Sequence, residues 1–401
     1  MFFKKNSERT NSSKTPVLVF DFGTTSVKIL RCNYSMDKVE ILDGRKVVYP
    51  AGVISGDELE HGERLLEPLA EAVAVLSGDD KQEVFSAVVG IGGLSVAGFT
   101  SQINYRRART ESTVTAAEFQ SILKKVENRA DQIMRKLIAW ETAEGNTSKL
   151  INSEVLDLSL DGYPVASPVG SAGKKLSFIV YNSYTKEVNL QAITALIADL
   201  KLDLVSVSPT MYAQLRLLLE NSDQNFSGLL LDVGGKTTEL GLVTNGRIIG
   251  HLAFDVAGES FSRSIAEELE EDLERGESLK LGFSAGKLPE ELSKDVREIV
   301  ASDCKVFLSG VELLLKEFPG TQGVPKQIYV SGGGGLLPGL VASIQTASSG
   351  EETGSKIAIS ALGISPKEIG GYQDLTGKLN SAADFPAVTV ALDAADLVGA
   401  D

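Results

Sequence analysis

The chain has few of the residues that build covalent or metal frameworks. Its 401 residues include two cysteines and two histidines, too few for a set of disulfides or a typical zinc site, so a reducing cytoplasm is the simplest compartment. Basic residues are also in deficit, since 39 Lys and Arg face 54 Asp and Glu, and the net charge is −15. This composition argues against a nucleic-acid partner, because a broad nucleic-acid surface requires a positive field.

Long hydrophobic runs are absent too. Nowhere do about 18 apolar residues follow one another, so the sequence predicts no membrane-spanning helix. The first residues lack the apolar core of a secretory signal, and 1–15 are polar and rich in Ser and Lys. We therefore expect a cytoplasmic protein with a flexible leader over 1–15, and a length of 401 residues allows two or three domains.

One short motif occurs twice, over 17–28 and 229–240. In each copy an apolar run ends in an aspartate, a glycine turn and two adjacent threonines follow, and apolar spacing then resumes. This pattern predicts a strand, a tight turn and a second strand. Glycine lets bare backbone N–H groups approach an anion, and the threonine hydroxyls add further donors. Two such turns facing each other would clamp one polyphosphate.

The aspartates of the two copies, Asp21 and Asp232, need a different role, because carboxylates repel phosphates. Mg²⁺ prefers carboxylate, water and phosphate oxygens, so these two side chains are expected to hold a hydrated Mg²⁺. Neither turn has the Walker spacing or the Rossmann glycine pattern that leads into a helix. The sequence therefore predicts a nucleotide site of another class.

Two further segments fit such a site. Glycines cluster over 332–335 after an apolar strand, where bare backbone would let a flat ring lie close. Glu277 and Lys280 lie three residues apart on one helical face. They could hydrogen-bond the ribose hydroxyls and adenine, or they could form an exposed ion pair of little energetic value.

With these three glycine motifs in this order, the chain resembles the actin, Hsp70 and sugar kinase superfamily. The resemblance implies an α/β fold of the actin-like ATPase type, in which two RNase H-like domains close on ATP with Mg²⁺. It also places Lys28 where related proteins carry a phosphate-contacting lysine. The nucleotide-binding residues expected on this basis are Asp21, Gly23, Thr24, Thr25, Lys28, Asp232, Gly234, Gly235, Lys236, Thr237, Thr238, Gly258, Glu277, Lys280, Gly332, Gly333, Gly334 and Gly335, with Asp21 and Asp232 also serving the metal.

More narrowly, the chain is similar to the FtsA and PilM branch, whose first domain carries a small α+β interaction subdomain called 1C, of the SHS2-like type. The segments that carry this likeness are 52–54, 88–93, 161–163, 168–176 and 276–280. The implied organisation is a leader (1–15), a first domain in two parts (16–86 and 171–225), the inserted subdomain (87–170), a second domain (226–370) and a C-terminal segment that returns to the first domain (371–401).

Three departures from the branch affect the expected function. Lys236 replaces a glycine, so its side chain either points away from the phosphates or adds a charge beside them. The segment 207–211 has no acid or amide where active relatives orient the attacking water, so we expect slow or absent hydrolysis. The acidic segment 371–401 has no basic amphipathic tail, so any contact with the inner face of a membrane is expected through a partner.

Three functions remain open from the sequence. The leading expectation is an FtsA-type, ATP-binding scaffold that links a cell division polymer, such as FtsZ, or a membrane complex to nucleotide state. Whether this scaffold forms a homopolymer is open from the sequence. The alternative is a PilM-like adaptor of type IV pilus assembly that binds a cytoplasmic peptide of a membrane protein. The segments 168–170 and 56–57 favour the first, and the missing tail favours the second. A sugar or acetate kinase is less favoured, since no candidate catalytic base has convincing spacing.

Overall fold

The computed structural model describes most of the chain, namely residues 16–35, 38–50, 52–55, 58–78, 85–93, 95–108, 110–138, 147–319, 325–348 and 360–398. The expected leader, 1–15, and the last residues, 399–401, lie outside these ranges. Within them, no helix combines the length and the apolar character needed to cross a bilayer.

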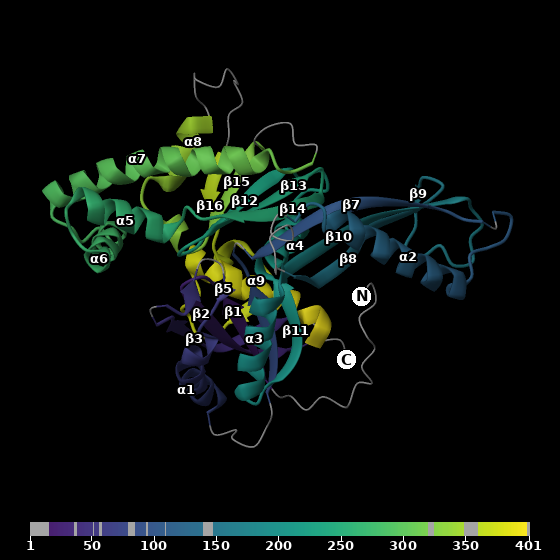
Figure 1. Ribbon diagram of the computed structural model, residues 1–401, viewed down its shortest axis with the longest axis horizontal. Helices are drawn as coiled ribbons and strands as arrows, with labels where there is room; N and C mark the ends of the chain where they lie inside the picture. The colour runs from purple at the N-terminus through teal and green to yellow at the C-terminus, as the bar shows by residue number, and fades with distance from the viewer. Residues whose placement is uncertain are drawn as a thin grey trace.

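Two β-sheets form the centre of the molecule (Figure 1). The first has the strand order β11-β6-β1-β2-β3-β17. Its strands are β1 (Val17–Phe22), β2 (Ser26–Tyr34), β3 (Val39–Val48), β6 (Ser86–Ile91), β11 (Asp203–Pro209) and β17 (Tyr372–Asp374). β1 pairs antiparallel with β2 and parallel with β6, which in turn pairs parallel with β11. The carboxyl ends of β1, β6 and β11 therefore meet at one edge.

Helices cover both faces of the first sheet, because successive side chains of a strand point to opposite faces. Leu18 belongs to a core with α1 (Leu66–Ser77) and α3 (Glu187–Asp199). Val19 faces the other way, into a core with α9 (Phe385–Asp393). The C-terminal segment thus packs on the sheet with which the described chain begins, and its β17 extends that sheet beside β3.

The second sheet has nine strands in the order β16-β15-β12-β13-β14-β7-β10-β8-β9. Its strands are β7 (Val96–Arg106), β8 (Ser148–Leu160), β9 (Tyr163–Pro164), β10 (Lys175–Lys186), β12 (Gly228–Val233), β13 (Thr238–Thr244), β14 (Arg247–Phe254), β15 (Gln327–Ser331) and β16 (Ser360–Gly363). The other helices are α2 (Ala116–Met134), α4 (Thr210–Glu220), α5 (Gly258–Glu268), α6 (Leu273–Ser284), α7 (Glu290–Leu315), α8 (Leu340–Ser348) and α10 (Ala395–Val398). Short elements are β4 (Ile54–Ser55), β5 (Glu58–Leu59), η1 (Gly62–Leu65), η3 (Gly334–Leu336), η4 (Pro366–Glu368) and η5 (Ala382–Asp384).

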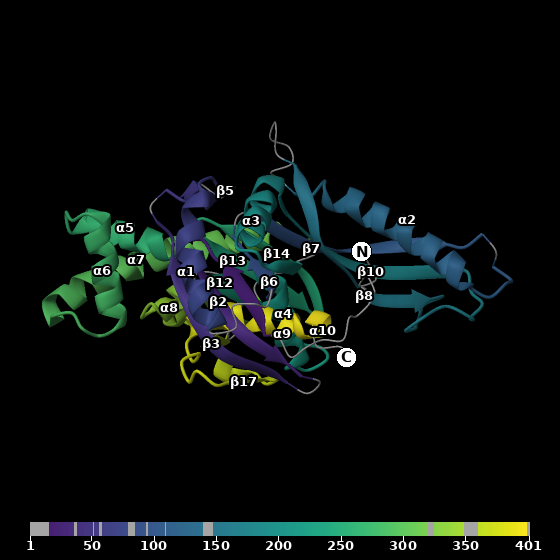
Figure 2. The same cartoon turned by 90° about the horizontal axis from the view of Figure 1, so that it is seen from below.

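The elements β7, α2, β8, β9 and β10 form a unit, here called the insert, that projects to one side in both views (Figures 1 and 2). Apolar side chains of α2, such as Ile122, and Phe178 of β10 make its own core. β7 also pairs with β14, where Gly98 lies opposite His251, so the insert continues the second sheet.

Two strands lie in different places from those the sequence predicts. β6, expected at the start of the inserted subdomain 87–170, is a central strand of the first sheet. β10, expected in the first domain over 171–225, pairs with β7 and β8 of the insert. An apolar run identifies a buried strand but not its sheet, because pairing partners come from distant parts of the chain. The insert therefore runs from Val96 to Lys186.

Candidate nucleotide-binding site

A cavity of about 310 Å³ opens between the two sheets. Both copies of the repeated motif line it, together with the glycine turn after β15 and the start of α4. Fifteen of the eighteen predicted nucleotide-binding residues line this cleft: Asp21, Gly23, Thr24, Thr25, Lys28, Asp232, Gly234, Gly235, Thr237, Gly258, Glu277, Lys280, Gly332, Gly333 and Gly334. The fold thus brings together segments that lie far apart in the sequence.

Each copy of the motif forms a hairpin turn. In the first, between β1 and β2, the Gly23 N–H donates to Ser26 O at 3.0 Å. In the second, between β12 and β13, the Gly234 N–H donates to Thr237 O at the same 3.0 Å. The equivalent hydrogen bonds show that the two turns have the same local build, as the repeated motif predicts.

The two turns touch each other across the cleft. The Lys236 N–H donates to the Thr24 hydroxyl at 3.0 Å, and any Cβ on Gly235 would collide with the Thr25 side chain. Glycine is therefore needed at position 235 for the close approach of the two sheets. Since one turn belongs to each sheet, a polyphosphate at this point would contact both.

The two predicted metal aspartates both face the cleft. Asp21 Oδ1 accepts a hydrogen bond from the Thr210 hydroxyl at 3.2 Å, and Asp232 Oδ2 accepts one from Gln214 Nε2 at 2.7 Å. Burial and the negative charge of Asp232 raise the pKa of Asp21 to about 7. Burial also raises the pKa of Asp232 to about 6. Both carboxyls therefore lack a compensating positive charge close enough to offset their burial.

This pair fits Mg²⁺ better than it fits a metal with an all-protein cage. Within the described ranges, no group of three or more His, Cys, Asp or Glu side chains is placed to hold a metal ion. Mg²⁺ usually takes one or two carboxylates and fills its remaining positions with water and phosphate oxygens. Asp21 and Asp232 would supply those carboxylates, so the donor set suits a metal that arrives with a nucleotide.

The other end of the cleft can receive a nucleoside. The 332–334 turn lies here, and the exposed side chains of Leu281 and Leu336 line the same cavity. Lys280 Nζ donates to Glu277 Oε2 at 2.7 Å and to the carbonyl of Gly258 at 2.8 Å. Apolar walls beside bare backbone suit a purine ring, and the ion pair offers both a donor and an acceptor.

Three lysines supply positive charge to the cleft. Lys28 Nζ bonds to Asp384 Oδ1 at 2.6 Å and to the carbonyl of Ala383, so its ammonium group is already held beside the C-terminal segment. Lys46 lies opposite Lys28 on β3, and burial together with Lys28 lowers its pKa. Lys280 is the third. Their charges would offset those of a bound polyphosphate.

Three predicted residues do not line the cleft. Lys236 turns its ammonium group toward the Ile54 carbonyl, at 3.4 Å, so it points away rather than adding charge at the phosphates. Thr238, the first residue of β13, is fully buried and donates to the Val256 carbonyl at 2.7 Å, because it faces the opposite side from Thr237. Gly335 is not among the lining residues, and a Cβ there would meet the Val330 side chain.

Glu239 lines the cleft but is not identified from the sequence. It is buried, and any Cβ on Gly92 would collide with its carboxyl group. Burial and the charges of Asp232 and Asp21 raise its pKa well above the usual range, and a hydrogen bond from the Gly93 backbone opposes this. A third carboxyl therefore lies in the cleft, beside Gly92 and Gly93. Side chains of a strand alternate between its two faces, so Glu239 lies on the same face as Thr237, and this alternation is the signal that could have identified Glu239 from the sequence.

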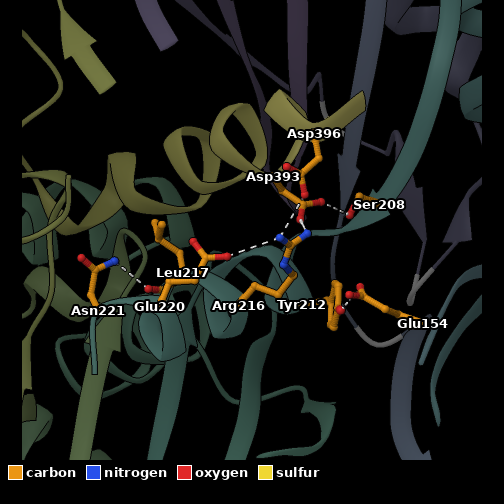
Figure 3. Close-up of polar contacts among 9 residues, drawn as sticks. All are labelled: Glu154, Ser208, Tyr212, Arg216, Leu217, Glu220, Asn221, Asp393 and Asp396. Atoms are coloured by element: carbon orange, nitrogen blue, oxygen red, sulfur yellow. Dashed lines mark hydrogen bonds and ion pairs between the residues drawn. The ribbon is translucent and has the colours of Figure 1, made fainter. Parts of the chain in front are cut away.

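Helix α4 joins the cleft to the rest of the molecule. On its outer side, Arg216 pairs with Asp393 at 2.9 Å and Asp396 at 3.2 Å (Figure 3). Tyr212 donates to Glu154 of β8 and stacks on Tyr181 with ring centroids 4.4 Å apart. One helix thus contacts the cleft, the insert and the C-terminal segment.

The burial of Asp21 predicts a pH-dependent stability in the absence of nucleotide. Its pKa of about 7 lies above the ordinary 3.8, so the folded protein binds this proton more tightly than the unfolded chain does. Stability from this group therefore falls as the pH rises from about 4 to 7 and is constant above. Asp21→Asn should remove the loss and stabilise the protein at pH 8 by roughly 2 to 4 kcal/mol.

Urea unfolding of wild type and Asp21→Asn at pH 5 and pH 8 measures this difference. Burial lowers the pKa of His251 to about 3, so its contribution to stability rises with pH up to about 6.5, opposite to that of Asp21. This contribution is the same in both proteins and cancels in their difference. A stability difference that does not grow between pH 5 and pH 8 would contradict the assignment of Asp21 as a buried, uncompensated carboxyl.

Comparisons by sequence give no assignment, since no protein-family model and no curated protein matches the chain. Comparisons of structure do. The PilM–PilN type IV pilus biogenesis complex matches with a TM-score of 0.65 and 15% identity over 96% of this chain and 99% of that chain. The ethanolamine utilization protein EutJ from Carboxydothermus hydrogenoformans matches with a TM-score of 0.50 and 13% identity over 96% and 91%. At these identities the likeness shows the fold: the protein has the mixed α/β actin-like ATPase fold, which confirms the predicted fold class.

Proposed function

We propose that the protein is an ATP-binding adaptor whose nucleotide state controls a protein partner at the insert. The observation that carries the proposal is the cleft in which two equivalent turns, one from each sheet, face each other. ATP would join the sheets through its phosphates, and Asp21 and Asp232 would hold its hydrated Mg²⁺, which neutralises phosphate charge when bound. A bound nucleotide would therefore favour the closed arrangement of the two sheets.

A role in pilus assembly has more support than a role in cell division. The likeness over nearly the whole chain is to a PilM–PilN complex, and neither structural match described above is an FtsA. We therefore favour the PilM-like adaptor, whose partner would be a cytoplasmic peptide of a membrane protein of the PilN type. The FtsA-type scaffold remains the second candidate, on the strength of the segment 168–170.

The insert offers a place for such a peptide. β9 pairs only with the end of β8, so most of the outer edge of β8 has no strand hydrogen-bonded to it in the described part of the chain. β11, the edge strand of the first sheet, lies next to β8. Leu150 of β8 and Val205 of β11 are exposed. An extended peptide could add to the β8 edge by backbone hydrogen bonds and place apolar side chains against these two.

Hydrolysis is proposed to be slow. The segment 207–211 forms the end of β11 and the start of α4, and only its Thr210 lines the cleft. A threonine hydroxyl bonded to Asp21 is poorly suited to orient an attacking water in place of a carboxylate or amide. ATP would then act chiefly as a ligand that selects one conformation.

Calorimetric titration with ATP and Mg²⁺, followed by sedimentation with and without lipid vesicles, tests the proposal. The adaptor should bind Mg²⁺-ATP, release little phosphate and stay in the supernatant. It should then bind a synthetic peptide from the cytoplasmic segment of a PilN-type protein, with an affinity that depends on ATP. ATP-dependent pelleting would instead favour the division-type polymer, and absence of ATP binding would refute both.

A variant pair locates the peptide. Leu150→Lys, on the exposed edge of β8, should weaken peptide binding while ATP affinity is unchanged. Leu313→Lys, at a leucine on α7 that is still more exposed, is the control and should leave both unchanged. Equal peptide affinity in the two variants would argue against the β8 edge.

A further inference from the structure

Helix α4 hydrogen-bonds both of the cleft aspartates. Thr210 and Gln214 are four residues apart, so their side chains lie on one face of the helix. The Thr210 hydroxyl donates to Asp21, from the first sheet, and Gln214 Nε2 donates to Asp232, from the second. A single rigid element therefore sets the position of two carboxylates that belong to different sheets.

The orientation of the Gln214 amide follows from its partners. Its Oε1 accepts a hydrogen bond from the Ser331 hydroxyl at 2.8 Å, and its Nε2 donates to Asp232 at 2.7 Å. A carboxylate accepts only, so the NH₂ group has to face Asp232. Gln214 and Ser331 are both fully buried, so water does not compete for these bonds. Ser331 directly precedes the 332–334 turn, and Gln214 thus connects the phosphate end of the cleft to the nucleoside end.

These bonds use one oxygen of each carboxylate. Thr210 occupies Oδ1 of Asp21, and Gln214 occupies Oδ2 of Asp232. Within the described ranges, the second oxygen of each aspartate accepts no side-chain hydrogen bond, so it is available for another ligand. Side chains that hold a metal-binding carboxylate in this way typically change metal affinity by about 10- to 100-fold when they are removed.

We propose that Gln214 is the positioning residue for the Mg²⁺ of the bound nucleotide, with Thr210 in the same role for the other aspartate. By fixing Asp232 against both α4 and Ser331, Gln214 presents the free carboxylate oxygen to the hydrated metal. The inference rests on the proposed function, since the metal would arrive with ATP. The inference assigns a role in metal binding to Gln214, which does not line the cleft and therefore would not contact the nucleotide.

The test measures ATP affinity by calorimetry twice for each protein, once in EDTA and once in excess Mg²⁺. Gln214→Met keeps the length of the side chain and removes both hydrogen bonds. The gain in affinity that Mg²⁺ provides should fall by about 10- to 100-fold, while the affinity in EDTA stays within about threefold of wild type. Direct binding of Mn²⁺ to the ATP complex, followed by electron paramagnetic resonance, should weaken in parallel.

Asn182→Leu is the matched control. Asn182 is a similarly buried amide, with hydrogen bonds to Ser153 and Tyr184 inside the insert. It should lower stability without changing the Mg²⁺ dependence. If Gln214→Met does not fold, Thr210→Val serves in its place, with an expected loss in Mg²⁺ dependence of about 10-fold, the lower end of the same range.

Two results would overturn the inference: an unchanged Mg²⁺ gain in Gln214→Met, or equal losses in EDTA and in Mg²⁺, which would show a purely structural role. Failure of wild-type protein to bind ATP in either buffer is a different outcome. It would refute the proposed function itself, whatever the variants do.

Discussion

Replacing Asp232 by asparagine should lower the affinity for Mg²⁺-ATP by at least about 100-fold and at the same time stabilise the nucleotide-free protein. The two effects have one cause. Asp232 is buried, and its pKa of about 6 lies well above the ordinary 3.8, so its negative charge is unfavourable until a cation arrives. Asparagine removes this charge but keeps the shape of the side chain and an oxygen that can accept from Gln214.

The size of the stability gain follows from the pKa. The rise in the pKa of Asp232 from 3.8 to about 6 corresponds to roughly 3 kcal/mol of lost stability at neutral pH. Asparagine recovers only part of this, because the hydrogen bond from Gln214 to a neutral amide is weaker than that to a carboxylate. We therefore expect a gain of about 1 to 3 kcal/mol. Urea unfolding without nucleotide measures the gain, and calorimetric titration in Mg²⁺ measures the loss of affinity.

Asp199→Asn is the control, because Asp199 is an exposed carboxylate at the end of α3 and should change neither quantity by a measurable amount. The combination of tighter folding and weaker binding separates a metal-holding aspartate from a structural one, whose loss would weaken both. Unchanged Mg²⁺-ATP affinity in Asp232→Asn would refute the assignment of the cleft.

The parts of the site that could be predicted are those that local chemistry determines. An aspartate at a strand end, a glycine turn and paired threonines define a hairpin within a dozen residues, and both hairpins form as predicted. The limit of this local argument appears at Thr238. Position 237 faces the cleft, so 238 faces the core and 239 faces the cleft again. The sequence motif therefore predicts two adjacent threonines in the site, whereas the alternation of side chains along the strand places Thr237 and Glu239 there.

Other cleft residues depend on long-range packing. Lys46 reaches the site because β3 pairs with β2. The register of this pair shifts beside Cys32, so counting residues back from the turn does not predict that Lys46 lies opposite Lys28. Leu281 and Leu336 read as ordinary helix and turn residues, and only the fold brings them to one cavity. The limits of the insert are uncertain from sequence for the same reason, since strand pairing assigns β6 and β10 to their sheets.

Adding one methyl group at Gly333 should separate nucleotide binding from folding. Gly333 has an ordinary helical φ of −66°, and a Cβ there would meet no atom within 4 Å, so Gly333→Ala should fold with unchanged thermal stability. The residue nevertheless lines the cleft. If the nucleoside lies against this bare backbone, the methyl group would occupy its place, and ATP affinity should fall by about tenfold or more, which is about 1.4 kcal/mol.

The neighbouring glycine should behave differently. Gly332 has a φ of +82°, which side-chain-bearing residues rarely adopt, and a Cβ there would collide with the Asp232 carboxylate. Gly332→Ala should therefore lose about 1 to 3 kcal/mol of stability together with binding. Gly363→Ala, at an exposed position of β16 with no atom within 4 Å, is the control for both. Thermal melts measure the stability of the three variants, and ATP titrations measure their affinity. Normal ATP affinity in Gly333→Ala would place the nucleoside elsewhere, even if the phosphates bind between the two turns.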